Sequence, residues 1–186
     1  DFVIVVSDYD GKDGGLVALH RDDGREAWRM ARPGSTSYSS PIVAHLDGRD
    51  QLLLSGCNRV VSYDPKSGRE IWSCEGPAAA TCGTLVWHDN LVFASGGYPQ
   101  KETLAVKADG SAEVVWRNQN RCYEQSMLSH NGYLYSINDT GIANCVDAKT
   151  GEQTWTSRLG GPVSASPVLA GGNIYISNEK GKTFVF

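Results

Sequence analysis

The sequence predicts an all-β protein, and three observations carry this prediction. Glycine is abundant, at 21 of 186 residues, and with Asn, Asp and Pro it interrupts short runs rich in Val, Thr, Tyr and Trp, as turns interrupt strands. No segment keeps its apolar residues at helical spacing. Tryptophan and glycine recur at one period along the chain. Together these features indicate a repeat protein built from antiparallel β-sheets.

The repeat consists of four segments, each of which ends in tryptophan. These segments cover residues 18–28, 62–72, 105–116 and 145–155. Their tryptophans lie 44, 44 and 39 residues apart, and their turn glycines lie 44, 42 and 41 residues apart. A period of about 42 residues is typical of the four-stranded blade of a β-propeller. We therefore predict a β-propeller of four-stranded antiparallel blades, of which about four and a half are present.

Residues 1–186 are expected to form a single propeller region. In the second unit, runs at 41–45, 51–55, 59–63 and 70–72 supply four strands, and the turns between them contain residues that tolerate positive φ. The blade segments are expected at approximately residues 1–32, 38–76, 81–118, 125–158 and 164–186.

The repeated motif has a physical interpretation at the turn between the third and fourth strands. An aspartate there accepts backbone hydrogen bonds, and a glycine supplies the left-handed residue of a bulged hairpin. The tryptophan then lies on the outer strand, where its ring packs against the neighbouring blade, a burial worth about 2 to 3 kcal/mol. The predicted docking residues are Trp28, Trp72, Trp116, Trp155, Gly24, Gly68, Gly110, Gly151, Asp64 and Asp147.

The pattern Ala-x-Asp-x-x-x-Gly-x-x-x-Trp resembles the tryptophan-docking motif of the quinoprotein, or PQQ-like, propeller family. Residues 40–43 and 166–169 also look like the blade openings of that family. The resemblance covers essentially the whole chain. The third unit departs most, because it has one extra residue before its tryptophan. The other departures are His20 and Lys107 at the Asp position, and Ser62 and Cys145 at the Ala position.

The resemblance implies a ring of about seven or eight blades, more than this chain supplies. The chain opens inside an expected strand at residues 2–6, so we expect an upstream segment. Any export signal would be part of that segment. We therefore expect either a fragment of a larger propeller or an arc closed by a second chain. An open arc leaves strand edges through which copies can associate.

Two functions follow from the resemblance. The first is a non-catalytic module that binds proteins or senses a ligand in the bacterial cell envelope, as in the propeller lipoprotein of outer-membrane protein assembly. The alternative is part of a PQQ-dependent alcohol or sugar dehydrogenase, which implies quinone, calcium and a vicinal cysteine pair. No two cysteines are adjacent in this sequence. We therefore expect no enzyme activity and no cofactor. PQQ and calcium would be bound only if the dehydrogenase alternative holds. The expected location is the periplasm or another extracytoplasmic part of the envelope.

Charge and hydropathy exclude two other kinds of partner. The net charge of −4 comes from 21 acidic and 17 basic residues that are interspersed, so no basic face is expected to hold nucleic acid. No apolar run approaches the roughly 18 residues of a membrane helix. A protein partner is the expected one.

Three histidines, His45, His88 and His130, fall at nearly the same place in successive units, 43 and 42 residues apart. In a propeller they would gather near one rim of the central channel and could hold a metal ion, an anion or a partner. Polar residues at turns are ordinary, so the simpler interpretation is that they have no shared role.

Two enlarged loops are the preferred contact surfaces. One carries Asp8, Asp10 and Asp13, a weak candidate for a cation site whose simpler interpretation is a solvated acidic turn. The other covers residues 96–102 and presents Tyr98. The serine-rich run 35–40 is either a ligand-facing surface or a hydrogen-bonded linker.

Five cysteines are scattered without metal-binding spacing. Cys74 and Cys82 are the nearest pair in sequence and could form a disulfide in an oxidising compartment. Buried, unpaired thiols are the alternative. The five positions are Cys57, Cys74, Cys82, Cys122 and Cys145.

Overall fold

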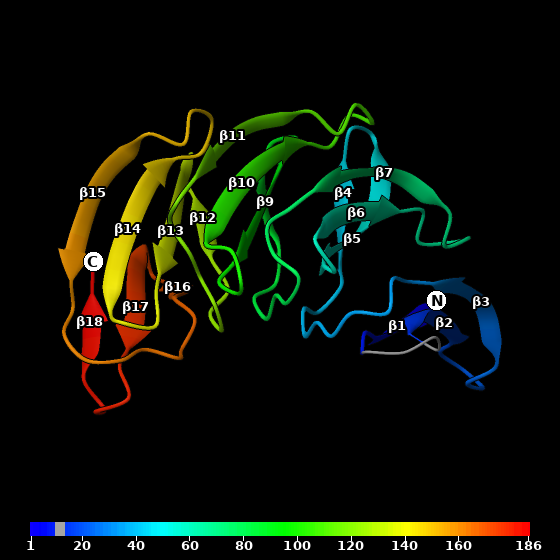
Figure 1. Cartoon of the computed structure of the whole chain (residues 1–186), viewed down its shortest axis with the longest axis horizontal. Helices are drawn as coiled ribbons and strands as arrows, with labels where there is room; N and C mark the ends of the chain where they lie inside the picture. Colours follow the sequence, from blue (N-terminus) through cyan, green and yellow to red (C-terminus); the bar gives the residue numbers. More distant parts are fainter. Residues whose placement is uncertain (10–13) are drawn as a thin grey trace.

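The computed structural model describes residues 1–9 and 14–186, and in these residues it contains 18 β-strands and no helix. The strands form five antiparallel sheets placed side by side in an arc, with the two termini at opposite ends (Figure 1). The predicted all-β propeller architecture with a partial ring is confirmed. Three four-stranded sheets lie between two three-stranded ones.

The first three sheets are each a simple meander. Sheet 1 contains β1 (Phe2–Ser7), β2 (Gly15–His20) and β3 (Glu26–Ala31). Sheet 2 contains β4 (Ile42–Leu46), β5 (Arg49–Gly56), β6 (Arg59–Tyr63) and β7 (Glu70–Glu75). Sheet 3 contains β8 (Val86–His88), β9 (Leu91–Gly96), β10 (Glu102–Lys107) and β11 (Val114–Asn118).

The last two sheets continue the same pattern. Sheet 4 contains β12 (Leu128–His130), β13 (Tyr133–Ile137), β14 (Ile142–Asp147) and β15 (Gln153–Arg158). Sheet 5 contains β16 (Val168–Ala170), β17 (Asn173–Ser177) and β18 (Thr183–Val185). We call sheets 1 to 5 blades 1 to 5.

The antiparallel meander gives each blade two rims with different kinds of connection. The linker rim carries the linkers from one blade to the next, the loops between the second and third strands of blades 2 to 5, and the loop between β1 and β2 of blade 1. The turn rim carries the short hairpin turns. In the described residues the linker rim comprises 8–9, 14, 32–41, 57–58, 76–85, 97–101, 119–127, 138–141, 159–167 and 178–182. The turn rim of the same residues comprises 21–25, 47–48, 64–69, 89–90, 108–113, 131–132, 148–152 and 171–172.

Apolar side chains fill the space between successive blades. Leu53 and Leu54 follow one another in β5 and both are fully buried, but Leu53 joins a cluster with blade 3 and Leu54 a cluster with blade 1. Because successive side chains point to opposite faces of a strand, a strand that is covered on both faces is apolar throughout. Burying one such leucine is worth about 2 kcal/mol. An interior blade is therefore stabilised by both neighbours.

Two tryptophans dock on the next blade in the same way. The indole Nε1–H of Trp28 donates to the Pro65 carbonyl at 3.2 Å, and that of Trp116 donates to the Ala148 carbonyl at 3.0 Å. A β-carbon added at Gly68 would lie 2.5 Å from the Trp28 ring, and one added at Gly151 2.6 Å from the Trp116 ring. Only glycine fits beneath each ring.

The seam between blades 2 and 3 is built differently. The Trp72 Nε1–H donates to Gln51 Oε1 at 2.8 Å, and Gln51 Nε2 donates to the Ala108 carbonyl of blade 3 at 2.8 Å. No tryptophan atom lies within 4 Å of a β-carbon placed on Gly110. The extra residue of the third unit is accommodated by Ala112, which has a φ of 56°. The buried amide of Gln51 thus relays a contact that is direct at the other two seams.

Trp155 of blade 4 is half-buried, and its ring contacts Tyr135 and Phe186 with centroids 6.2 and 5.5 Å away.

The aspartates of the motif close the turns that precede the outer strands. Asp147 Oδ1 accepts from the backbone N–H groups of Lys149 and Thr150 at 2.8 and 2.9 Å. Asp64 makes the same pair of bonds in blade 2. The Thr150 N–H lowers the pKa of Asp147 because the bond favours the carboxylate. Gly24, Gly68, Gly110 and Gly151 all have positive φ.

Candidate functional site

Hydrogen bonds run from one linker to the next along the linker rim. The backbone N–H of Thr84 donates to Ser126 Oγ at 3.0 Å, and the N–H of Ser126 donates to Ser166 Oγ at 2.9 Å. Each hydroxyl therefore accepts from the equivalent residue of the preceding blade. Ser39 Oγ extends the series by donating to the Gly83 carbonyl at 3.1 Å. This series makes the linker rim a fixed platform for the loops that project from it.

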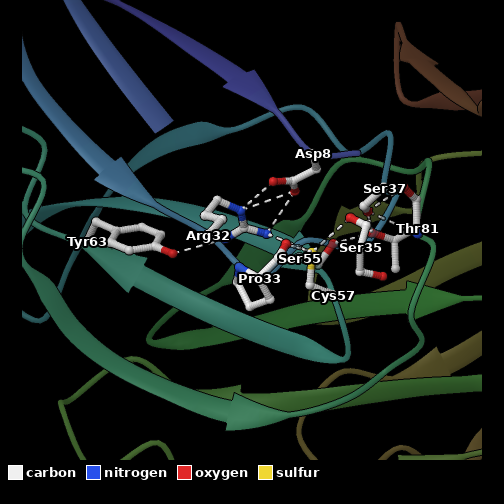
Figure 2. Close-up of polar contacts among 9 residues, drawn as sticks. All are labelled: Asp8, Arg32, Pro33, Ser35, Ser37, Ser55, Cys57, Tyr63 and Thr81. Carbon is white, nitrogen blue, oxygen red and sulfur yellow. Dashed lines mark hydrogen bonds and ion pairs between the residues drawn. The ribbon is translucent and has the colours of Figure 1, made fainter. Parts of the chain in front are cut away.

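A cluster of buried hydroxyls reinforces the linker between blades 1 and 2 (Figure 2). Ser37 Oγ lies 3.2 Å from the Thr81 carbonyl, to which it donates, and Ser55 Oγ lies 3.1 Å from Thr81 Oγ1. All three residues are at least nine-tenths buried. The serine-rich run thus has two parts, because Ser37 is a buried linker residue while its neighbour Tyr38 is 65% exposed.

Arg32 and Asp8 form an ion pair in the interior, 2.8 Å between Nε and Oδ1, with each side chain only 1% exposed (Figure 2). Arg32 also donates to the Tyr63 hydroxyl of blade 2 at 3.0 Å. Burial alone would lower the pKa of Arg32, but its hydrogen bond to Asp8 raises it above the ordinary value. Burial raises the pKa of Tyr63. The pair joins the loop after β1 to the linker after β3, and Arg32 connects both to blade 2 through Tyr63.

The proposed acidic cation site is affected directly by this ion pair. Both oxygens of Asp8 accept from Arg32, so this carboxylate is held inside the protein. Asp10 and Asp13 lie outside the described residues. In the described part of the chain, no group of three or more His, Cys, Asp or Glu side chains is arranged to hold a metal ion.

The three histidines do not occupy equivalent positions. His88 and His130 are the last residues of their strands and pair with Leu91 and Tyr133 across two-residue turns. His45 lies one residue further from its turn, opposite Asp50, and its Nδ1 is 2.8 Å from the Asp50 carboxylate. A shift of one residue turns a side chain to the other face of the strand. The structure therefore places His45 on the face opposite to that of His88 and His130, with all three near the turn-rim ends of their strands.

The 97–101 loop presents Tyr98, which is 64% exposed. Its backbone is held by the linker of blade 2, because the Ala80 N–H donates to the Tyr98 carbonyl at 3.4 Å. On the other side Gly97 packs so closely on Tyr123 that an added β-carbon would lie 2.8 Å from the Tyr123 Cβ. Tyr9, on the first of the two enlarged loops, is 45% exposed on the same rim.

All five cysteines are free thiols, so Cys74 and Cys82 form no disulfide in this structure. Burial raises the pKa of Cys122 to about 12, and it raises the pKa of Cys57, Cys74 and Cys82 as well. These thiols have the properties of small apolar core residues. The adjacent cysteines that the dehydrogenase alternative implies are not among them.

Two cavities lie next to one another on the linker rim and share Lys101 and Gln119. The first, of about 420 Å³, lies between the loops of blades 2 and 3. The second, of about 360 Å³, lies between those of blades 3 and 4. Sequence reasoning did not identify this pair, because its side chains come from loops and linkers of three blades. The linings are Asn58, Glu75, Gly76, Pro77, Gln100, Lys101, Glu102, Arg117 and Gln119 for the first, and Lys101, Gln119, Asn120, Arg121, Asn138, Thr140, Ile142 and Asn144 for the second.

Two relatives in the comparison with known proteins carry different names, one that of an assembly factor and the other that of an enzyme. The chain is 25% identical over 153 residues to the outer membrane protein assembly factor BamB of Legionella pneumophila, covering 77% of this chain. It is 21% identical over 194 residues to the tetrathionate hydrolase of Acidithiobacillus ferrooxidans, covering 91% of this chain. In each case the chain spans 38% of the relative's length.

Solved structures show the same fold. The crystal structure of BamB from Moraxella catarrhalis superposes with a TM-score of 0.71 at 17% identity, covering 99% of this chain and 61% of that one. In the described part of the chain, no helix has the length and hydropathy to span a bilayer. The family profile described as outer membrane protein assembly factor BamB matches residues 1–140 and 100–186. This chain therefore belongs to the PQQ-like repeat propeller family that this profile represents.

Proposed function

We propose that this chain is a non-catalytic docking module that binds proteins in the bacterial cell envelope through its linker rim. The observation that carries the proposal is the position of three exposed tyrosines on that rim. Tyr9, Tyr38 and Tyr98 are 45%, 65% and 64% exposed. Tyrosine supplies a large, rigid contact area together with a hydroxyl, and it is enriched at protein interfaces.

The segments that carry Tyr38 and Tyr98 are fixed by the scaffold beneath them. The Tyr38 N–H donates to the Thr81 carbonyl at 2.9 Å, and Tyr98 is bonded to Ala80 of the preceding linker. A surface held in place before binding loses less conformational entropy when a partner docks. Binding loops on a rigid scaffold are a common way for one fold to serve many partners.

Family membership and the relative from Legionella pneumophila, which is named for outer-membrane protein assembly, support an envelope location and a protein partner. The tetrathionate hydrolase relative supports the second candidate, a catalytic role. For that candidate we find no supporting arrangement of side chains in the described residues, where neither adjacent cysteines nor a metal-ligating cluster occurs.

The docking proposal is tested by photocrosslinking in the native bacterium. The full protein would carry p-benzoylphenylalanine in place of Tyr38, Tyr98 or, as the control, Tyr133, which is 38% exposed at the turn-rim end of β13. We expect discrete crosslinked proteins at Tyr38 and Tyr98 and none at Tyr133. Equal crosslinking at all three positions, or none at the linker rim, would contradict the proposal.

The enzyme candidate has its own assay. The full protein would be incubated with PQQ, calcium, a panel of alcohols and sugars, and an artificial electron acceptor. We expect no reduction of the acceptor. Turnover that requires PQQ would establish the dehydrogenase instead.

A further inference from the structure

The two adjoining cavities of the linker rim are lined by side-chain amides that have no partner. The amides of five lining residues make no hydrogen bond within the described part of the chain, although the same rim is otherwise rich in such bonds. These residues, which we call the amide groove together with Lys101, are Asn58, Gln100, Gln119, Asn120 and Asn144.

Asn144 is the most buried member of this set. It lies on β14, is only 7% exposed, and lines the second cavity. Its amide atoms make no hydrogen bond, yet they are not among the fully buried side-chain atoms that lack a partner, so the small exposed part of the residue includes the amide. This amide is therefore open to a group that enters the cavity.

The charges around the groove leave one cation free. Arg117 is paired with Glu102 at 2.6 Å, and Arg121 with Asp139 at 2.9 Å. Lys101, which lines both cavities, has no acceptor within the described residues. Glu75 is the other unpaired charge, and it lines only the first cavity. A ligand that crosses both cavities thus meets a single positive charge near its middle.

These features indicate the chemistry of the ligand. A primary amide presents a donor and an acceptor side by side, as a peptide unit does, so several such amides along two adjoining cavities can pair with the N–H and C=O groups of an extended main chain. The linings contain no aromatic side chain in the described residues, and an aromatic face is what a sugar ring commonly packs against. Resting on the docking function proposed above, we propose that the amide groove binds an extended peptide segment whose acidic side chain pairs with Lys101.

The experiment is a positional-scanning array of ten-residue peptides probed with the full protein, its Lys101→Glu variant and its Asn144→Ala variant. We expect the unmodified protein to select Asp or Glu at one fixed position by at least ten-fold. Lys101→Glu should reverse this choice to Lys or Arg at the same position. Asn144→Ala should weaken binding of every selected peptide, because it removes an amide that faces the main chain.

Controls separate these effects from general ones. Lys149→Glu makes the same charge change at an exposed lysine of the turn rim and should leave the selection unchanged. Because Lys101 is exposed and unpaired, Lys101→Glu should also keep the thermal unfolding midpoint. N-methylation of a selected peptide's backbone should weaken binding at least ten-fold.

The proposal would be overturned if no acidic position were selected, if Lys101→Glu left the choice unchanged, or if N-methylation had no effect. Binding to a glycan array that is lost in Lys101→Glu would assign the groove to a carbohydrate instead. Tyr38 lies on the linker between blades 1 and 2 and lines neither cavity, so photocrosslinking at Tyr38 does not depend on Lys101. A failed array with intact crosslinks at Tyr38 would therefore reject the groove alone, and absent crosslinks at both tyrosines would reject the docking function.

Discussion

The Trp116 ring covers Gly151 of the next blade so closely that an added β-carbon would lie 2.6 Å from Trp116 Cδ2. Gly151 also has a φ of 72°, a conformation that side chains with a β-carbon rarely adopt. The same glycine thus meets two requirements, one from its turn and one from the neighbouring blade, and the two can be separated by mutation.

Gly151→Ala should lower the free energy of unfolding by about 3 kcal/mol, because it adds a clash with the ring to the strain of positive φ. Gly24 occupies the same turn position in blade 1 with a φ of 72°, and nothing lies within 4 Å of its added β-carbon. Gly24→Ala should therefore cost only about 1 kcal/mol. Urea denaturation measures both, and equal losses would show that the ring contact contributes nothing.

Gln51→Leu should destabilise the seam between blades 2 and 3 by about 2 to 4 kcal/mol. The substitution leaves the Trp72 N–H and the Ala108 carbonyl without their partner in a buried position. The control is Gln153→Leu on the exposed part of β15, which should change stability by less than about 0.5 kcal/mol. Thermal unfolding with tryptophan fluorescence tests both variants.

Arg32→Met should cost about 3 to 5 kcal/mol, because it leaves the Asp8 carboxylate buried and unpaired. Asp8→Leu should cost a similar amount for the reciprocal reason. The double variant should be more stable than the sum of the two losses predicts, since it removes both charges. Additive losses in this double-mutant cycle would show that the two groups are not coupled.

Acid should weaken the turns of the repeat. Hydrogen bonds in the folded turns lower the pKa of Asp23, Asp109 and Asp147. A lowered pKa gives stability that is present above the unfolded value of about 3.9 and is lost as the pH falls through the folded value. Asp147→Asn should therefore show a flatter dependence of stability on pH below about 4 than the unmodified chain. Parallel curves would contradict this role for Asp147.

Thiol labelling should separate the cysteines by burial. Cys122 is 1% exposed with a pKa of about 12, so it should react with a maleimide only after unfolding. Cys74 and Cys82 are partly exposed and should react in the folded protein, though slowly because burial raises their pKa. Mass spectrometry after labelling in denaturant should count five thiols, and a count of three would reveal a disulfide.

The spacing of tryptophan and glycine was enough to predict the blades, because each unit repeats the same local turn chemistry at a nearly constant distance. It could not decide the face on which His45 lies. Spacings of 43 and 42 residues look equivalent, but a single residue of difference moves a side chain across a strand. A period that varies by one or two residues predicts which elements are present more reliably than which side chains meet.

Contacts between distant residues were also beyond sequence reasoning. From the sequence, Asp8 is expected to belong to an acidic turn, yet its ion-pair partner Arg32 lies 24 residues away along the chain. Gln51 is one polar residue ahead of an apolar run, and its role depends on Trp72 and on a carbonyl 57 residues away in the chain. The amide groove draws on three blades at once. In each case the informative signal is created only when the blades come together.

The tryptophan hydrogen bonds at three seams run in one direction, since Trp28 and Trp116 each donate to the blade that follows and Trp72 reaches the next blade through Gln51. Each blade therefore has a donor side and an acceptor side, and these complement the acceptor and donor sides of its neighbours. A duplication or deletion of one whole unit in the gene would join the same two kinds of side again, with no new seam to evolve. Arrays of this type can thus change length in steps of one blade while the chemistry of their joints stays the same.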